Sequence, residues 1–289
     1  NYYKFDYLNV ATPRSAAPTI KKVFTFTKYL ESINLNDFSV EKDVALLYSR
    51  ASEDWWQLKY KKQVNKSLLG NLTQNGVMEV LFKESVPFDL FYLDQPDLLK
   101  NLDQYGVVIL PFPYSISLQS YQKLNQLALN GAKILVVNKK GEVDELGVLY
   151  DYPLLANTDK FIPVKIDFNN TNYEIVSDKL MTAVDNALGR ELTLSVNASD
   201  HDIECTVHRH IRNNDKLLFC LNWENKGYQV GFNLNAPDGL YKINKIDLES
   251  ISLMVKADGE EVFDAIELKS LNINIKKGDA FVLRVQEVK

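Results

Sequence analysis

Residues 107–115 have the sequence VVILPFPYS, and the first five of them decide the fold of the region around them. Val107–Pro111 is a continuous apolar run, which is typical of a parallel β-strand that is buried on both faces of its sheet. Two runs of the same kind, Val44–Tyr48 and Lys133–Val137, lie on either side of it in the chain. Hairpins cannot join parallel neighbours, so we expect helical crossovers between these strands.

Helical periodicity occupies the intervals between the strands. Ser52–Leu69 and Leu118–Asn130 repeat apolar residues at helical spacing, and Gly131 suits the C-terminal cap of the second helix. Asp89–Tyr92 has the composition of one further strand. This alternation predicts an α/β domain, in which helices cover both faces of a parallel sheet.

The pattern changes in the second half of the chain. One more helix is expected at Asp178–Leu188, and short segments of alternating polarity continue from there to the C-terminus. We expect seven strands, separated by turn-forming residues: Leu192–Val196, Ile203–His210, Lys216–Asn222, Tyr228–Leu234, Gly239–Ile246, Ile251–Val255 and Ala280–Val285. Antiparallel strands at this spacing predict an all-β part, a β-sandwich.

These patterns divide the chain into three expected parts. Residues 1–40 form an N-terminal segment with a helix at Thr19–Ile33, residues 41–188 form the α/β domain, and residues 189–289 form the C-terminal sandwich. The apolar stripe of the first helix has to cover another surface, and we expect that surface in a domain outside this sequence. The chain starts at Asn1 rather than at Met, which indicates a removed leader or a piece of a longer protein.

Composition and charge argue against several classes of partner. Of the 289 residues, 46% are hydrophobic and 25% are charged, and the formal net charge is −5. Nucleic acids and anionic membranes need a basic surface, so we predict neither as a partner. The two cysteines, Cys205 and Cys220, are too few for a disulfide framework. We expect both to be buried as small apolar side chains, and a disulfide between them stays open.

The α/β half lacks the residues of two familiar kinds of site. Phosphate-binding turns need glycine after the first strand, but Tyr48–Ser52 has none, so we predict no cofactor. A nucleophile elbow, the sharp strand-to-helix turn that exposes a Ser or Cys, would follow Val107–Leu110. Ser115 is the candidate there, but no glycine flanks it and all three histidines lie in the second half. We therefore predict no catalytic residue on this chain.

Two of the histidines share one side of an expected strand. His208 and His210 are two residues apart, and side chains alternate with period two along a strand. Together with His201 or Glu204 they have the residue types of a metal site. A polar strand surface explains them better, so no metal is predicted.

The most unusual surface signal is Asp54-Trp55-Trp56. Adjacent tryptophans point in different directions from a helix, so we expect one of them to contact a partner, a neighbouring domain or a carbohydrate. Burial of both rings by local packing explains the pair equally well, and both interpretations stay open. Trp223 and Tyr228 in the second half are the other candidates for binding carbohydrate.

Several segments carry a resemblance to a known family. They are Asp43–Tyr48 with Asp54–Trp56, Leu93 with Leu98–Tyr105 before Val108–Pro111, and Asn130–Val137 with Gly141–Glu145. In their order they resemble the trimerisation domain of family-42 glycoside hydrolases, the β-galactosidases, and Gly278–Leu283 is similar to the end of their small β domain. The resemblance implies a flavodoxin-like or class I amidotransferase-like sheet that has lost its nucleophile.

The same resemblance implies a supporting role. The catalytic glutamates of the family lie in a barrel domain that is absent here, so no residue role is carried over. We expect a non-catalytic C-terminal region of a β-galactosidase-like glycoside hydrolase, which supports the catalytic barrel of the same protein and forms a homo-oligomer. A carbohydrate-binding accessory module is one alternative. A stand-alone amidotransferase-like hydrolase that uses Ser115 or an acidic residue is the other.

Overall fold

The structure is a computed structural model that describes residues 3–5, 11–13, 17–100, 102–169, 172–197, 203–222, 226–247 and 250–288. Contacts divide the chain into two compact units. One is the α/β unit, Lys42–Ser195, and the other is the sandwich unit, which combines Asn1–Glu41 with Val196–Lys289. The expected boundaries of separate domains near residues 40 and 188 remain predictions.

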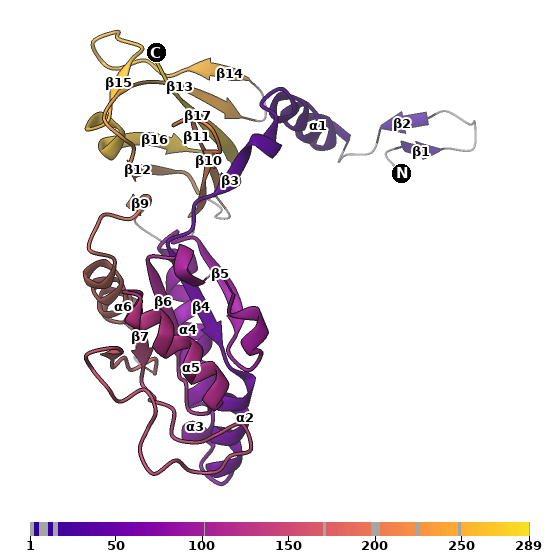
Figure 1. Cartoon of the computed structure of the whole chain (residues 1–289). Helices are drawn as coiled ribbons and strands as arrows, with labels where there is room; N and C mark the ends of the chain where they lie inside the picture. The colour runs from indigo at the N-terminus through magenta and orange to yellow at the C-terminus, as the bar shows by residue number, and fades with distance from the viewer. Residues whose placement is uncertain are drawn as a thin grey trace. The chain divides into compact units, whose positions relative to one another are not determined.

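The α/β unit is built on one parallel sheet of five strands (Figure 1). In spatial order these are β5 (Phe88–Tyr92), β4 (Val44–Tyr48), β6 (Val107–Pro111), β7 (Lys133–Val137) and β8 (Ile162–Val164). Numbered along the chain, this order is 2-1-3-4-5, which is the flavodoxin-like arrangement. The predicted fold class is therefore confirmed for this half.

Helices cover both faces of that sheet. They are α2 (Arg50–Lys59), α3 (Val64–Ser67), α4 (Leu69–Lys83), α5 (Leu118–Leu129) and α6 (Tyr173–Leu188). Leu81 of α4 and Leu180 of α6 share one apolar core with Leu46, whereas Leu124 of α5 shares the other with Leu47. Because β4 faces an apolar layer on each side, its residues had to form the continuous apolar run seen in the sequence.

The single helix expected at Ser52–Leu69 is interrupted. The apolar spacing continues through this stretch, but the backbone at residues 60–63 forms a turn, with the N–H of Gln63 donating to the carbonyl of Tyr60 at 2.7 Å. The indole Nε1 of Trp56 donates to the carbonyl of Lys66 at 2.7 Å. That hydrogen bond joins α2 to a carbonyl of α3 and holds the short helix against α2. The periodicity of the sequence does not reveal such a bond.

One carboxylate joins the two ends of the α/β unit. Asp43 is buried just before β4, and its side chain accepts a hydrogen bond from Arg190 and another, at 3.2 Å, from the N–H of Thr193. Residues 190–193 follow α6, so the start and the finish of the unit are held together. The last residues before the second half therefore belong to the α/β unit.

The sandwich unit consists of two antiparallel sheets. The larger has the order β14-β13-β17-β11-β10-β3, with β15 beside β13, and the smaller has the order β16-β12-β9. The strands are β3 (Phe38–Val40), β9 (Leu194–Asn197), β10 (Ile203–His210), β11 (Lys216–Asn222), β12 (Tyr228–Leu234), β13 (Leu240–Asp247), β14 (Ile251–Leu253), β15 (Phe263–Asp264), β16 (Leu271–Ile275) and β17 (Ala280–Glu287). The predicted β-sandwich is confirmed, although β3, β15 and β16 were not among the expected strands.

The N-terminal helix α1 (Ala17–Glu31) packs on the sandwich unit. Phe26, Tyr29 and Leu30 lie against an apolar core that includes Leu217 and Val282 of the larger sheet. Part of the apolar stripe therefore covers a surface within this sequence. Before α1, β1 (Tyr3–Phe5) pairs with β2 (Ala11–Pro13), and four short 3-10 helices complete the described elements: Leu35–Asp37, Pro96–Leu98, Leu102–Gln104 and Glu267–Ser270.

A buried ion pair holds β3 in the larger sheet. Lys216, at the start of β11, is only 4% exposed, and its Nζ lies 2.6 Å from Oε2 of Glu41, directly after β3. The N–H of Glu41 also donates to the carbonyl of Val207 in β10 at 2.9 Å. A buried ammonium group without a partner would cost several kcal/mol, so this pair makes the addition of β3 specific.

The two cysteines form a cross-strand pair in the core of the sandwich. Cys205 of β10 lies directly opposite Cys220 of β11, both side chains are buried, and their Sγ atoms are 3.1 Å apart as free thiols. Burial raises the pKa of the Cys220 thiol, with a further contribution from the adjacent Cys205. Neither thiol is therefore poised to react with a reagent dissolved in water.

We expect both thiols to resist iodoacetamide in the folded protein and to react fully in guanidinium chloride. A mild oxidant should link Cys205 to Cys220 within one chain, because the two sulfur atoms already touch. Peptide mass spectrometry measures both results, and the Cys205→Ser variant is the control that cannot form the link. Fast alkylation of native protein, or a disulfide between chains, would contradict this packing.

Candidate functional site

The edge of the sheet at which β4 to β8 end is called the carboxyl edge here. In open parallel sheets ligands bind at this edge, next to the point where the strand order reverses, which lies between β4 and β6.

The N-terminus of α2 at this point is occupied by a carboxylate of the chain itself. Asp94 follows β5 and accepts hydrogen bonds from Oγ of Ser49 at 2.8 Å and from the backbone N–H groups of Arg50 and Ala51 at 2.7 and 3.1 Å. A helix N-terminus attracts anions because its first N–H groups lack partners within the helix. Asp94 satisfies those groups, so this helix end offers no place for a phosphate.

The turn after β6, where the sequence placed a nucleophile elbow, carries Phe112. Its φ is 59°, in the left-handed region that a bulky residue rarely adopts. The phenyl ring is fully buried, and it meets Trp56 edge to face with ring centres 5.1 Å apart. A Cβ on Gly70 would lie 3.2 Å from this ring, which is tighter than an ordinary contact, so the glycine eases the close approach of α4. The buried ring of Phe112 therefore stands where a nucleophile elbow would carry its reactive side chain.

Ser115, the predicted candidate for a nucleophile, is a structural residue. It is buried, and its Oγ donates to the carbonyl of Asp144 at 2.8 Å. Its N–H and its carbonyl both bond to Oγ of Ser52, at 2.9 and 3.0 Å. The hydroxyl holds a loop in place, and no histidine exists in the α/β unit to activate it.

Sequence reasoning missed one buried acid at this edge. Glu53 is 3% exposed and accepts hydrogen bonds from the hydroxyl of Tyr48 at 2.8 Å, from Gln57 at 3.0 Å and from Asn71 at 3.1 Å. Burial raises the pKa of Tyr48, and the bond to Glu53 raises it further. The only sequence signal was the i, i+4 pair of Glu53 and Gln57, which does not reveal burial. With three donors around it, this carboxylate anchors α2 to β4 and α4.

The two adjacent tryptophans do point apart. Trp56 is buried among Phe112, Tyr114 and Tyr60, so it belongs to the core. Trp55 is half-buried, and its Nε1 donates to the carbonyl of Glu145 at 3.2 Å.

The indole of Trp55 also lies against the loop after β7. A Cβ on Gly147, whose φ is +81°, would lie 2.8 Å from the Trp55 ring. Asp54 is exposed and accepts from Nε of Arg50 at 3.0 Å. Of the three predicted interface residues, Trp55 therefore contacts a surface loop, whereas Asp54 faces solvent.

That loop presents a row of apolar side chains. Leu146, Val148, Leu149 and Tyr152 are between 60% and 82% exposed. The loop is nevertheless ordered, because Oδ1 of Asp144 accepts from the N–H groups of residues 146 and 148 at 2.9 and 2.8 Å. We refer to residues 144–152 as the apolar loop. Scattered exposed leucines are ordinary, but a contiguous set on a supported loop is typical of an interaction surface.

The candidates in the sandwich unit are dispersed. Tyr228 is half-buried, with Nζ of Lys226 5.0 Å from its ring centre, and Trp223 lies outside the described residues. His208 lies against Phe219 and His210 against Phe38, with ring centres 4.8 and 5.0 Å apart. Each histidine is thus packed on an aromatic ring of its own.

Among the residues that the structure describes, no three His, Cys, Asp or Glu side chains gather as they would around a metal. His201 lies outside the described residues. Within the described ranges, no helix is long and apolar enough to cross a bilayer.

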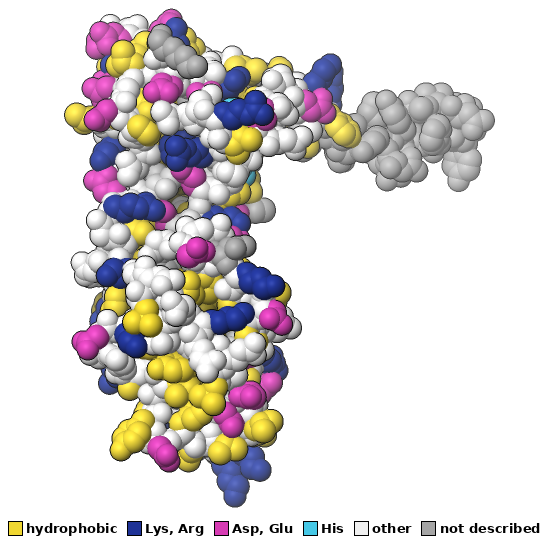
Figure 2. All heavy atoms as spheres, viewed as in Figure 1, with side chains coloured by type: hydrophobic (Ala, Val, Ile, Leu, Met, Phe, Trp, Pro, Cys, Tyr) yellow, Lys and Arg dark blue, Asp and Glu magenta, His cyan; other side chains and the backbone are white. Residues whose placement is uncertain are grey.

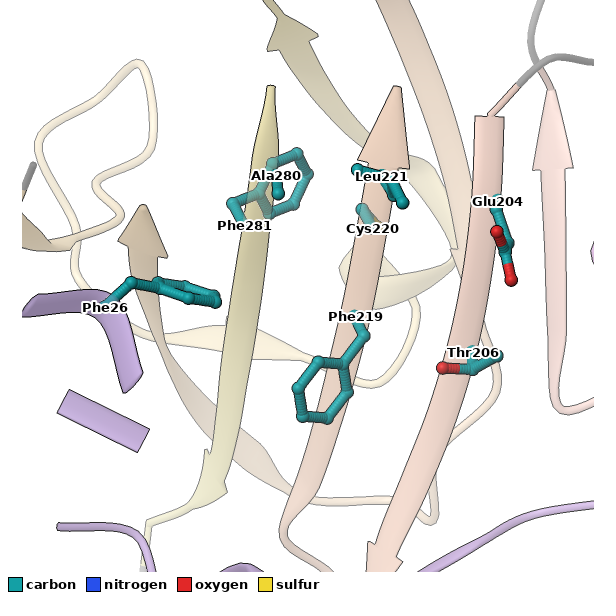
Figure 3. A pocket seen from close by; sticks show the side chains of 8 residues that line it. All are labelled: Phe26, Glu204, Thr206, Phe219, Cys220, Leu221, Ala280 and Phe281. Carbon is teal, nitrogen blue, oxygen red and sulfur yellow. The ribbon is translucent and has the colours of Figure 1, made fainter. Parts of the chain in front are cut away.

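A small pocket of about 250 Å³ lies on the outward face of the larger sheet (Figure 3). Figure 3 shows Phe26 of α1 beside β17, with Phe219 on β11 and Glu204 and Thr206 on β10. Of the described residues that line it, Glu204 is the only carboxylate, so they do not supply the paired acids of glycoside hydrolysis.

Comparison with known proteins gives a match in fold alone. No protein-family profile and no curated protein sequence matches the chain. Solved structures do match, and one is a β-galactosidase from Bacillus circulans sp. alkalophilus, with 13% identity and a TM-score of 0.62 over 92% of this chain and 44% of its own. Another is the apo exo-carrageenase GH42 from Bacteroides ovatus, with 16% identity and a TM-score of 0.53 over 94% of this chain and 32% of its own.

This chain has the fold of a part of family-42 glycoside hydrolases. It spans about a quarter to a half of the length of the structures it matches, and the rest of those proteins has no counterpart in it. The resemblance inferred from the sequence is thereby confirmed at the level of fold. The fold also occurs in α-L-fucosidase isoenzyme 2 from Paenibacillus thiaminolyticus, with 12% identity and a TM-score of 0.62 over 96% of this chain and 53% of its own.

The buried ring in the turn after β6 leads to a prediction about Phe112. Replacing it with Ala should lower the free energy of unfolding by about 3–5 kcal/mol, because a buried ring is lost. Phe112→Gly should be more stable than Phe112→Ala by about 1 kcal/mol, because glycine adopts a positive φ without strain. Denaturant unfolding measures the order of stability of the two variants. Phe82→Ala is the control, because Phe82 on α4 is half-exposed. A more stable Ala variant would show that the turn is not left-handed.

Proposed function

We propose that this chain is the non-catalytic C-terminal region of a glycoside hydrolase that resembles β-galactosidases. In this role it supports a catalytic barrel of the same protein and assembles subunits into a homo-oligomer. The observation that carries the proposal is Phe112, because the one turn of this fold that would expose a nucleophile buries an aromatic ring. The match in fold to part of a family-42 β-galactosidase supports the choice of enzyme class.

The apolar loop supports the assembly role. Its apolar side chains lie on a face of the α/β unit that no described segment of that unit covers. The ring of Trp55 packs against the loop at Gly147. Figure 2 shows hydrophobic side chains gathered at the end of the α/β unit that carries α2 and α3. A second copy of the chain brings an equally apolar surface, which is the condition for a self-complementary interface.

Among the described residues, the candidates predicted for the two alternative functions do not favour either of them. A carbohydrate-binding module needs protruding aromatic rings, but Trp56 is buried and Trp55 rests on the apolar loop. A stand-alone amidotransferase-like hydrolase needs an accessible Ser115, which is buried and bonded on every side. Both remain alternatives to the assembly role.

The proposal predicts that the isolated chain does not hydrolyse aryl β-galactosides or aryl α-fucosides. A fluorescence assay over several aryl glycosides measures this, and Glu53→Gln tests the one deeply buried acid at the carboxyl edge. Turnover by the wild-type chain that Glu53→Gln abolishes would overturn the non-catalytic role.

We also predict that the chain self-associates in solution through the apolar loop. Light scattering should give a mass above that of one chain, and Leu146→Asp combined with Leu149→Asp should reduce it to the monomer, because two charges enter an apolar interface. Ile266→Asp is the control, since Ile266 is 78% exposed but lies in the sandwich unit. A monomeric wild-type chain, or an unchanged oligomer in the double variant, would refute this interface.

A further inference from the structure

An open pocket of about 660 Å³ lies at the carboxyl edge, where β6, β7 and β8 end. Its walls come from the segments that follow these strands and from α2, α3 and α6. Phe112 also lines this pocket and separates it from the point between β4 and β6, where Asp94 occupies the N-terminus of α2. Pockets for small molecules usually measure ~300–1,000 Å³, so the space suits a compact organic ligand.

The pocket is strongly basic in a chain whose net charge is negative. Lys66, Lys139, Lys165 and Lys179 line it, against the single carboxylate of Asp167. That carboxylate already accepts from the backbone N–H and the side-chain amide of Asn169, at 3.0 and 3.1 Å. Three of these lysines, Lys66, Lys165 and Lys179, form no ion pair with a carboxylate of the described residues.

Aromatic rings hold two of the ammonium groups in position. Nζ of Lys66 lies 3.9 Å from the centre of the Tyr60 ring, and Nζ of Lys139 lies 4.1 Å from that of Trp56. A ring attracts a cation through its quadrupole but carries no net charge, so the Tyr60 ring holds the charge of Lys66 in place without neutralising it. Lys139 also lies 3.5 Å from Glu142, the one carboxylate paired with it.

We propose that this pocket binds a small organic anion that bears a phosphate or sulfate ester. The ester lies among the ammonium groups of Lys139, Lys165 and Lys179, and the rest of the molecule lies against Tyr60. Tetrahedral oxyanions accept several charge-assisted hydrogen bonds at once, and lysines that line one pocket can provide them. This site is separate from the apolar loop, so it does not depend on the proposed assembly role.

Calorimetric titration of the full chain tests the proposal with five probes: galactose 6-phosphate, galactose 6-sulfate, galactose, sodium phosphate and sodium sulfate. We expect saturable binding of at least one sugar ester and none of galactose, and the preferred ester identifies the source of the anion. Lys165→Gln combined with Lys179→Gln should weaken binding by about tenfold or more, since charge-assisted hydrogen bonds are lost. Lys133→Gln, at the opposite end of β7, should bind like the wild type.

A second measurement does not require variants. Acetylation of native protein by acetic anhydride, followed by peptide mass spectrometry, should show Lys139, Lys165 and Lys179 protected by the bound ester, with Lys133 unprotected. The proposal is overturned if neither ester binds, if galactose binds equally well, or if only the inorganic ions bind. It is overturned equally if Lys133→Gln weakens binding as much as the double variant does.

Discussion

The left-handed backbone at Phe112 is the constraint on which the carboxyl edge of the α/β unit depends. A chain that leaves a buried strand with a positive φ turns sharply and directs its side chain into the layer beneath the adjacent helices. An enzyme with this turn uses it to expose a nucleophile. Here the same turn buries a phenyl ring, and the hydrophobic gain offsets the backbone strain. Gly70 lets α4 lie close to that ring, because a side chain at this position would crowd it.

Trp56 transmits this arrangement to both sides of the edge. One side of its ring system packs on Phe112, so it helps to close the point where the strand order reverses. Lys139 lies over the same indole at the wall of the open pocket. A single aromatic cluster thereby lies between the closed turn after β6 and the open pocket.

Much of the fold was predictable because the buried strands are uninterrupted apolar runs. Val44–Tyr48, Val107–Pro111 and Lys133–Val137 were predicted with their observed bounds. The break after α2 was not, because it depends on the bond from Trp56 to Lys66 rather than on local preference. β16 was missed although it alternates well. The candidate site was less predictable, since burial of Trp56 and convergence of four lysines arise from segments distant in sequence.

In the sequence, the α/β unit is inserted into the sandwich unit, and this order has a consequence for biosynthesis. On the ribosome, β3 emerges before the α/β unit, but β10, with which it pairs, is translated after that unit. The α/β unit can complete its own fold in that interval, because Asp43 joins its first strand to residues 190–193 at its end. Until then β3 is an unpaired edge, and its three-residue length limits pairing with other nascent chains. The larger sheet can be completed only after β17 has been translated, because β17 lies between β13 and β11.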